Sequence, residues 1–230
     1  MASLIITGAN GNLGLTVVKR LLKDGYHLHA AVGHSGEKNL PRDGRLEISQ
    51  LDLSSEEASK KFVEYSIVKY PDIRAAVLLV GGFAMGNLIS TKKSDLDKMI
   101  NLNFYTAFHI VRPLLAHFLS RPGGGGQFIL IGARPGLEAD AGKDFFPYSM
   151  SKAMIFKLAE FINAEGKEKE VTATVIVPST INTEANRKEM PDADFSKWVP
   201  AENIADAISF SLSETGRMTR DSVIKLYNRS

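Results

Sequence analysis

The sequence predicts an α/β fold, a parallel sheet of about seven strands that is doubly wound and covered by helices on both faces. Three observations support this prediction. Short apolar runs of strand length alternate with longer amphipathic runs throughout the 230 residues. The run 75–80 is apolar without interruption, as expected of a parallel strand buried on both faces. The first strand passes directly into a helix through a glycine-rich turn, and no linker divides residues 1–230, so we expect one domain.

The elements are expected in regular alternation along the chain. The first strand begins at Leu4, and the helix after it contains the amphipathic run 15–22. Ser54 and Ser55 precede two glutamates, and a serine cap with acids in the first turn is typical of a helix start. The other strands are expected at 26–32, 46–51, 75–80, 127–131, 171–177 and 222–227, and the other helices from 54 to about 70 and at 95–119, 147–167 and 201–213.

Two of the expected helices, 95–119 and 147–167, carry apolar residues on more than one face. A helix that is apolar nearly all round is buried on both sides, so one side is expected to pack on the sheet and the other on a second copy of the protein. We therefore expect a homodimer or a homotetramer held together through these long helices. Pro113 lies inside the first helix and is expected to kink it or to mark an earlier end.

The composition argues against several classes of function. The chain has no cysteine, so it has no disulfide framework and no thiolate metal site. Its five histidines form no metal-binding pattern, and we expect them at surface or hydrogen-bonded core positions. The 28 basic and 26 acidic residues are interspersed, which argues against a nucleic-acid surface. No apolar run reaches about 18 residues and no signal peptide precedes the first strand, so we expect a cytoplasmic protein that makes no membrane contact.

The turn after the first strand has the glycine spacing of a dinucleotide site. Gly8 permits a tight turn, Gly11 lets a pyrophosphate approach the backbone, and Gly14 lets the helix pack closely on the sheet. Unpaired N–H groups of the first helical turn would face the anion. An ordinary glycine-rich turn is the alternative, but the flanking strand and helix favour a Rossmann-type nucleotide site. The residues between the glycines that are expected to contact the same ligand are Asn10, Asn12 and Leu13.

The end of the second strand bears on the choice of cofactor. The chain there is Gly-His-Ser-Gly, residues 33–36, and lacks the acid that commonly pairs with a ribose 2′-hydroxyl. A 2′-phosphate is therefore not repelled, so the sequence favours NADP over NAD. His34 and Ser35 are expected to bind this phosphate, with help from Lys38 or Arg42. The alternative is an ordinary glycine-rich turn.

In a doubly wound sheet the ligand lies beyond the carboxyl ends of the strands. Asp52 follows the third strand and is expected either to hydrogen-bond the adenine edge or to cap the next helix, two roles that we weigh equally. The polar segment 179–200 is too long for an ordinary connection and is expected to be a substrate lid. The unusual residues of the chain gather at this edge, in segments 8–14, 33–36, 52–53, 81–86, 132–136 and 178–183.

Tyr148 and Lys152 lie four positions apart, so on a helix they share one face. A lysine cation near a phenol favours the tyrosinate and is expected to lower the tyrosine pKa, so that the phenol can transfer a proton near neutral pH. The spacing alone is weak evidence, because Tyr65 and Lys69 repeat it. We expect that second pair on a solvated helix face, whereas Tyr148 begins a helix beside the expected cofactor site.

These motifs together resemble the short-chain dehydrogenase/reductase family over essentially the whole chain. Thr7 and the three glycines resemble its cofactor loop, and Asp52-Leu53 resembles its adenine contact. The resemblance implies that Tyr148 and Lys152 are the catalytic pair and that Asn103, in the long helix, is the catalytic asparagine. It also implies cofactor contacts after the fourth strand, at Gly81, Gly82 and Phe83, and in a nicotinamide-binding turn, at Pro178, Thr180, Ile181 and Thr183.

Two departures from the family pattern bear on the substrate. The loop after the fourth strand begins Gly81-Gly82-Phe83 in place of the usual Asn-Asn-Ala-Gly, and Ala133 stands where the family has a catalytic serine. Loss of one such hydrogen-bond donor costs roughly 3 kcal/mol in a carbonyl reaction, so ordinary alcohol or ketone chemistry is disfavoured. Both departures, and the lid segment 186–200, are similar to the dihydropteridine reductase branch of the family.

The branch resemblance implies a planar, pterin-like or quinonoid substrate that is reduced by hydride transfer, with Tyr148 as the proton donor. Its electron-poor ring needs no serine to polarise a carbonyl. Phe83 and Trp198 are expected to sandwich this substrate beside Ala133, and for both aromatic residues the alternative is simple packing under the lid. Two other functions remain open, reduction of another carbonyl or quinone compound and a catalytically silent NAD(P)-binding sensor.

Overall fold

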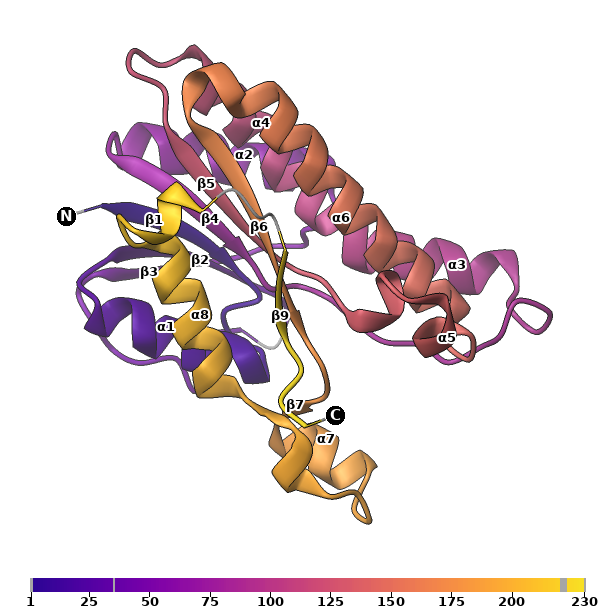
Figure 1. The fold of residues 1–230 in the computed structure, drawn as a ribbon. Helices are drawn as coiled ribbons and strands as arrows, with labels where there is room; N and C mark the ends of the chain where they lie inside the picture. Colours follow the sequence, from indigo (N-terminus) through magenta and orange to yellow (C-terminus); the bar gives the residue numbers. More distant parts are fainter. Residues whose placement is uncertain (1, 35, 220–222, 230) are drawn as a thin grey trace.

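The computed structural model describes residues 2–34, 36–219 and 223–229. Its centre is a parallel sheet of seven strands in the order β3-β2-β1-β4-β5-β6-β9, which confirms the predicted fold class (Figure 1). The strands of this sheet are β1 (Ser3–Thr7), β2 (His27–Val32), β3 (Leu46–Gln50), β4 (Ile73–Leu78), β5 (Gly126–Ile131), β6 (Val171–Pro178) and β9 (Val223–Leu226). The helices are α1 (Asn12–Lys23), α2 (Glu56–Lys69), α3 (Lys93–Ile100), α4 (Thr106–Ser120), α5 (Ala139–Gly142), α6 (Phe146–Gly166), α7 (Glu184–Glu189) and α8 (Ala201–Leu212).

Helices cover both faces of the sheet, and each face has its own apolar core. Helices α1 and α8 lie on one face, and α2, α4 and α6 lie on the other (Figure 1). Leu21 and Ile208 belong to the core under the first pair, whereas Phe118 and Phe128 belong to the core under the second set. None of the helices among the described residues is long and apolar enough to cross a membrane.

The fourth strand lies two residues earlier than the sequence predicts, at 73–78 instead of 75–80. It pairs with β1 up to the register Thr7–Leu78, and β1 ends there because Gly8 turns the chain with φ +66°. A side chain is strained at such a φ, which explains the glycine. The turn therefore ends both strands together and leaves residues 79–82 free to line the ligand edge of the sheet.

The long helix predicted at 95–119 consists of three parts. An α-helix over Lys93–Ile100 passes through a π-helical turn at Asn101–Tyr105 into a second α-helix over Thr106–Ser120. The prediction that Pro113 marks an earlier helix end is wrong, because the proline lies within the last part. The π-helical turn is a separate irregularity that precedes the proline, and such turns occur often at functional sites.

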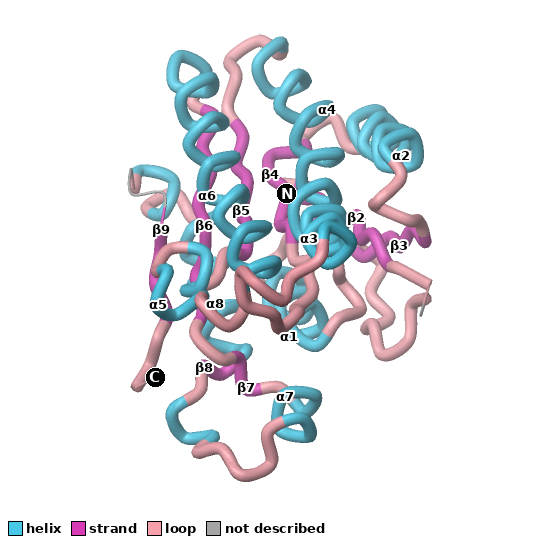
Figure 2. The backbone as a smooth tube through the Cα atoms, turned by 90° about the vertical axis from the view of Figure 1, so that its right-hand side faces the viewer, coloured by secondary structure: helices cyan, strands magenta, loops and turns pink. Residues whose placement is uncertain are grey.

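The segment predicted as a lid, 179–200, has structure of its own. It contains α7, a turn of 3₁₀ helix at Phe195–Lys197, and a two-stranded parallel sheet of β7 (Ile181–Asn182) and β8 (Val199–Pro200). Figure 2 shows that α7 and this small sheet extend from the body of the molecule beyond the ends of the main strands. Asn228 donates hydrogen bonds to the carbonyl oxygens of Ser196 and Trp198, so the last described residues fasten the lid.

Candidate active site

The glycine-rich turn between β1 and α1 forms a cradle that fits the pyrophosphate of a dinucleotide. The Gly11 N–H donates to the Gly8 carbonyl oxygen at 3.0 Å, and Gly11 is the N-cap of α1 without a side-chain cap. The first turn of α1 contains no acidic residue, so nothing there repels an anion. A Cβ atom at Gly14 would lie 2.1 Å from the Gly8 carbonyl oxygen. Because glycine has no Cβ, the helix can lie this close to the turn.

The expected ligand contacts between the glycines have different surroundings. Asn10 donates from Nδ2 to the Gly36 carbonyl oxygen at 2.7 Å and so ties the glycine turn to the segment after β2. Asn12 is exposed, and Leu13 packs against the core under α1 and α8. Asn10 therefore fixes the distance between the glycine turn, which would hold the pyrophosphate, and the segment after β2, which would hold the adenosine ribose.

A cavity of about 680 Å³ continues from the glycine turn along the carboxyl ends of the strands. Gly8, His34, Asp52, Leu53 and Val80 line it, together with residues of α3 and the π-helical turn such as Lys98 and Asn101. Of the expected adenine and phosphate contacts, Asp52, Leu53 and His34 line the cavity. Lys38 and Arg42 do not line it, and Ser35 lies outside the described residues. Its size and its walls suit the adenosine half of a dinucleotide.

Asp52 is not the cap of α2. Its Oδ1 accepts hydrogen bonds from the backbone N–H and the hydroxyl of Ser54, at 2.9 and 2.7 Å, and these bonds hold the pKa of Asp52 below its usual value. The cap is Ser55, whose hydroxyl accepts from the Ala58 N–H. Of the two roles that the sequence leaves open for Asp52, the cap is therefore excluded, and its carboxylate lies at the wall of the cavity.

Tyr148 and Lys152 lie on the first turns of α6, as predicted, but the pKa of Tyr148 is shifted in the opposite direction to the one expected. Lys152 is buried and donates from Nζ to the Ile131 carbonyl oxygen at 2.8 Å, while its Nζ lies 6.0 Å from the centre of the Tyr148 ring. Burial lowers the pKa of Lys152 to about 8 and raises the pKa of Tyr148 to about 12. The expected decrease in the tyrosine pKa is wrong for this structure, because desolvation outweighs the influence of a lysine that is bound elsewhere.

The depressed pKa of Lys152 predicts a pH-dependent stability. Between about pH 8 and 10.5 the unfolded chain holds a proton on this lysine that the folded protein has lost, so the free energy of unfolding rises with pH over this range. Without added cofactor, we expect wild type to gain about 3 kcal/mol relative to Lys152→Met between these limits. Urea denaturation of both proteins across this pH range measures the difference, and parallel curves would contradict the prediction.

Asn103 joins the loop after β4 to the helix that carries Tyr148. Its side chain is buried, its Oδ1 accepts the Gly82 N–H at 2.9 Å, and its Nδ2 donates to the Gly82 carbonyl oxygen at 3.1 Å. The same Nδ2 donates to the Ser151 hydroxyl at 3.0 Å, and that hydroxyl donates to the Tyr148 carbonyl oxygen at 2.7 Å. A Cβ at Gly81 would lie 2.7 Å from Asn103 Oδ1, so this glycine permits the close approach. The network thus joins the predicted residues Gly82, Asn103 and Tyr148. Ser151 links Asn103 to Tyr148, and the sequence contains no signal for this role.

The ring of Phe83 packs against the ring of Tyr148. The Phe83 ring is 57% exposed, and its centre lies 5.1 Å from those of Tyr148 and Phe145. Ala133 lies just beyond β5 with 5% of its surface exposed and provides no hydroxyl. The hydroxyl of Ser149 donates to backbone carbonyl oxygens, so it does not replace the missing serine. The side chain in contact with the Tyr148 ring, that of Phe83, is therefore flat and apolar.

The turn expected at the nicotinamide lies where β6 leads into the lid. Pro178 ends β6, the Thr180 carbonyl oxygen accepts the Val199 N–H, and Ile181 belongs to β7. Thr183 caps α7, because its hydroxyl accepts the Asn186 N–H at 3.2 Å. These bonds fix the backbone of the turn at the ligand edge of the sheet.

Trp198 is packed beneath the lid in this structure. It is 6% exposed, and its ring centre lies 4.8 Å from that of Phe195. This arrangement corresponds to the packing alternative that the sequence leaves open. Phe83 is therefore the more accessible of the two expected ring contacts.

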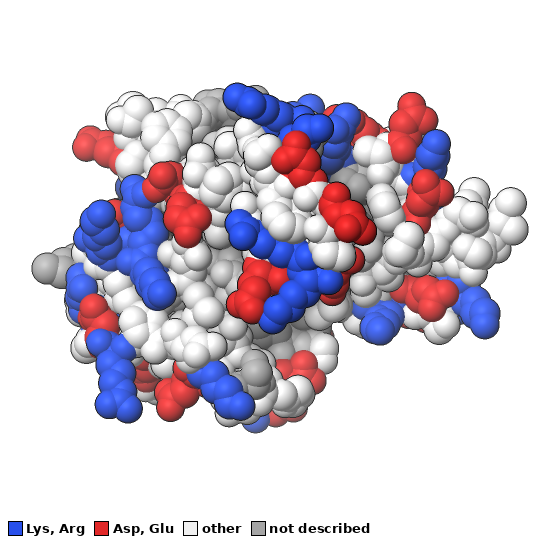
Figure 3. Space-filling view, turned by 90° about the horizontal axis from the view of Figure 1, so that it is seen from below, with Lys and Arg blue, Asp and Glu red and all other residues white. Residues whose placement is uncertain are grey.

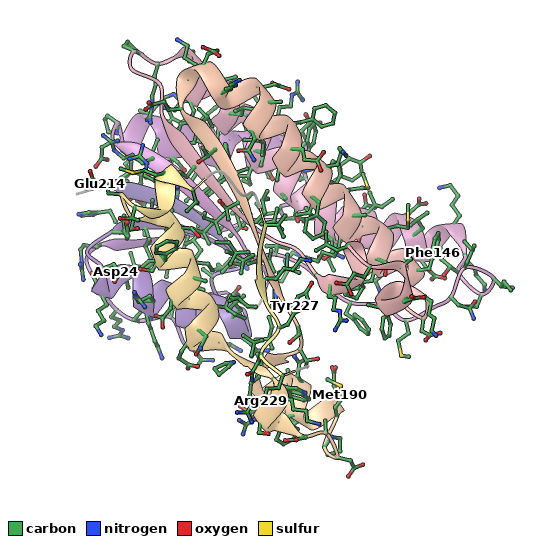
Figure 4. The ribbon with its side chains drawn as sticks, in the orientation of Figure 1. Asp24, Phe146, Met190, Glu214, Tyr227 and Arg229 are labelled. Atoms are coloured by element: carbon green, nitrogen blue, oxygen red, sulfur yellow. The ribbon has the colours of Figure 1, made fainter. Side chains whose placement is uncertain are left out.

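Met190, 41% exposed at the end of α7, lies on the side of the lid that faces the body of the molecule (Figure 4).

The second tyrosine–lysine pair lies away from this site, as expected. Lys69 donates to the Tyr65 hydroxyl at 3.0 Å on the exposed side of α2 and forms an ion pair with Glu47. His29 is buried and hydrogen-bonded to serine hydroxyls on both ring nitrogens, as predicted for a core histidine. His117 does not fit that prediction, because its Nε2 is buried without a hydrogen-bond partner among the described residues.

The charges around the ligand edge do not form a patch of one sign. Figure 3, which views the molecule from the side of the lid, shows basic and acidic side chains intermixed over this face. Among the residues that the structure describes, no group of three or more histidine or acidic side chains could hold a metal ion.

Comparison with known proteins agrees with this geometry. The family model of the short chain dehydrogenases matches residues 2–194. The chain is 28% identical to the dihydropteridine reductase of Dictyostelium discoideum, over 99% of this chain and 95% of that protein. It is 22% identical to a 3-oxoacyl-[acyl-carrier-protein] reductase of Aggregatibacter actinomycetemcomitans, over 96% of each chain. The solved structure of ElxO with NADP bound superposes with a TM-score of 0.88 at 22% identity and covers 98% of this chain and 96% of its own.

The family match spans the glycine cradle, Asn103, Tyr148, Lys152 and most of the lid. The site geometry and the sequence match thus lead to the same assignment. The chain belongs to the short-chain dehydrogenase family.

Proposed function

We propose that this oxidoreductase uses NADP(H) to reduce a planar, pterin-like or quinonoid substrate. The observation that carries the proposal is the exposed aromatic residue Phe83, whose ring centre lies 5.1 Å from that of Tyr148. Ala133, which follows β5 where the family has a serine, supplies no hydroxyl. The similarity to a dihydropteridine reductase over nearly the whole chain supports the same substrate class.

NADP fits the cradle for three reasons. The first turn of α1 contains no acid, the segment after β2 has His34 in place of a carboxylate, and the cavity beyond has room for an adenosine. Lys98, from α3, lines the same cavity and adds a cationic group to a wall that also carries Asp52 and Asp97. The solved structure of ElxO, a neighbour with the same fold, has NADP bound, which supports this choice of cofactor.

The residues of the chain divide the reaction between them. Bound NADPH would supply a hydride. Tyr148 would donate a proton from its hydroxyl to the reduced ring, and its raised pKa means that it holds that proton at neutral pH. Lys152, whose Nζ lies 6.0 Å from the centre of the Tyr148 ring, would stabilise the phenolate that remains. Asn103 holds the backbone of Gly82, the residue before Phe83. Phe83 would lie against the flat face of the substrate and exclude water from it.

A turnover assay tests the proposed function. Oxidation of NADPH is followed with quinonoid dihydropterin, benzoquinone and a simple ketone as acceptors, and then repeated with NADH. We expect turnover of at least one of the two planar rings, a value of kcat/KM at least tenfold lower for the ketone, and a preference for NADPH. Efficient ketone reduction would contradict the substrate assignment. Measurable cofactor binding without turnover of any acceptor would favour the silent sensor.

We also propose that the chain forms a dimer through α4 and α6. The outer side of these helices forms an apolar groove of about 500 Å³, lined by residues such as Phe108, Leu115, Leu158 and Phe161. Phe161 is 60% exposed although it lies in this groove. Exposed apolar patches of this kind mark protein–protein contacts, and a second copy would bring a matching groove.

Substitution of Phe161 by glutamate is expected to weaken this dimer at least a hundredfold, because the interface would then bury an unpaired carboxylate. Sedimentation velocity at micromolar concentration measures the change in mass. Val68→Glu on α2, where the wild-type side chain is 81% exposed, is the control and should leave the mass unchanged. A monomeric wild type would contradict the proposal.

A further inference from the structure

The loop between β4 and α3 exposes an unusual set of apolar side chains. Within residues 83–89, Phe83 is 57% exposed, Met85 72%, Leu88 68% and Ile89 96%. The same seven residues contain no charged side chain. Single exposed apolar residues are common on protein surfaces, whereas several together mark a binding surface. We refer to Met85, Leu88 and Ile89 as the apolar tip.

The backbone of this loop is firmly held. The Gly86 N–H donates to the Asp144 carbonyl oxygen at 2.9 Å, and the Phe146 N–H donates to the Gly86 carbonyl oxygen at 2.7 Å. Asn87 Oδ1 accepts the N–H groups of Ile89 and Ser90, at 3.1 and 2.9 Å. These bonds hold the loop in place while its apolar side chains are exposed to water, which is unfavourable unless a ligand covers them.

The apolar tip is continuous with the candidate active site through Phe83. This ring contacts the reactive phenol of Tyr148, and Gly82, the residue before it, is bound on both backbone groups by Asn103. The tip begins two residues further along the chain. Figure 1 shows the segment that leads into α3 extending at the right-hand edge of the molecule, beyond the first turn of α6. A ligand anchored at Tyr148 and Phe83 could therefore extend outward along this loop.

We propose that the apolar tip binds a hydrocarbon substituent on the ring of the substrate. The inference rests on the proposed function and adds to it that the natural substrate is lipophilic. A hydrocarbon chain needs apolar side chains and no hydrogen-bond partner, which is what residues 83–89 offer beyond the ring of Phe83. The continuity with Tyr148 favours a substituent of the reacting molecule over an unrelated partner.

The experiment compares rings that differ only in the chain. The pairs are benzoquinone with decyl-benzoquinone, and 6-methyl with 6-decyl quinonoid dihydropterin, each assayed with NADPH. For a ring that is turned over, we expect the decyl chain to raise kcat/KM at least tenfold in wild type. The double variant Leu88→Ser/Ile89→Ser should lose most of this increase and keep its activity on the ring without the chain. Val68→Ser, an equally exposed apolar position on α2, should behave like wild type.

Three results would overturn the inference. One is equal kcat/KM with and without the chain in wild type, which would leave the proposed function intact. Another is an equal loss on both members of a pair in the double variant, which would show that the tip acts only through the fold. A third is dissociation of a wild-type oligomer by the double variant in sedimentation, which would assign the tip to an interface between copies. If no ring is turned over, the proposed function fails and the inference fails with it.

Discussion

Substitution of Tyr148 by phenylalanine is expected to reduce kcat by a factor of roughly 10² to 10⁴, the usual contribution of a positioned proton donor. The phenol is the hydroxyl group that lies beside the exposed ring of Phe83, and the nearby Ser149 and Ser151 hydroxyls are both committed to backbone carbonyl oxygens. Neither serine is therefore placed to take over the proton. Removal of one oxygen atom leaves the ring contacts intact, so cofactor binding should change less than threefold.

The effect is measured by NADPH oxidation under saturating substrate, with the dissociation constant of NADPH measured separately by fluorescence. Tyr65→Phe is a matched control, because Tyr65 has the same spacing to a lysine but lies on the exposed side of α2. It should retain full activity. Undiminished turnover by Tyr148→Phe would remove the phenol from the mechanism.

The second large effect is expected from Gly14→Ala. A Cβ at this position would lie 2.1 Å from the Gly8 carbonyl oxygen and 2.7 Å from that of Ala9, and both are backbone atoms that cannot turn aside. Helix α1 would have to move away from the turn, at a cost of roughly 2–4 kcal/mol in the free energy of unfolding. The movement would also displace the N–H groups of the cradle, so we expect NADPH affinity to fall by at least a hundredfold.

Gly44→Ala is the control for this variant, because a Cβ at Gly44 would have no neighbour within 4 Å. Urea denaturation and fluorescence titration give the two quantities. Since Gly14→Ala could also fail to fold, Gly11→Ala provides an independent test. Its Cβ would approach only the Gly8 carbonyl oxygen, at 3.2 Å, so the fold should be retained while the pyrophosphate is kept away from the backbone. Unchanged affinity in Gly11→Ala would contradict the assignment of the cradle.

Much of the architecture could be predicted from sequence because its elements are periodic. The alternation of apolar strands with amphipathic helices predicts all seven strands of the main sheet, and the carboxyl-end rule places the cradle, Asp52 and Tyr148 at one edge. The short strands β7 and β8 of the lid escape such reasoning, because two residues are too few to show a period. The position of β4 depends on where β1 ends, which is a property of the pair and not of either segment.

The features of the site that could not be predicted depend on burial. The spacing of Tyr148 and Lys152 predicts their shared helix face, but the sign of the pKa shift follows from desolvation and from the Ile131 carbonyl oxygen, neither of which a spacing reveals. The π-helical turn at Asn101–Tyr105 has no compositional signal. Asn103 lies within this turn and bonds to both Gly82 and Ser151, partners that lie 21 and 48 residues away in the chain.

The central position of β1 has a consequence for the order in which the protein assembles on the ribosome. β1 lies between β2 and β4, so both of its neighbours have been synthesised once residue 78 has emerged. The four strands β3, β2, β1 and β4 can then pair as a unit that already contains the glycine cradle and Asp52, while α6, which carries Tyr148, is still to be made. Lys98 and Asn101, which complete the wall of the cavity, are synthesised after this unit, so cofactor would favour productive folding only once α3 and the π-helical turn have been added.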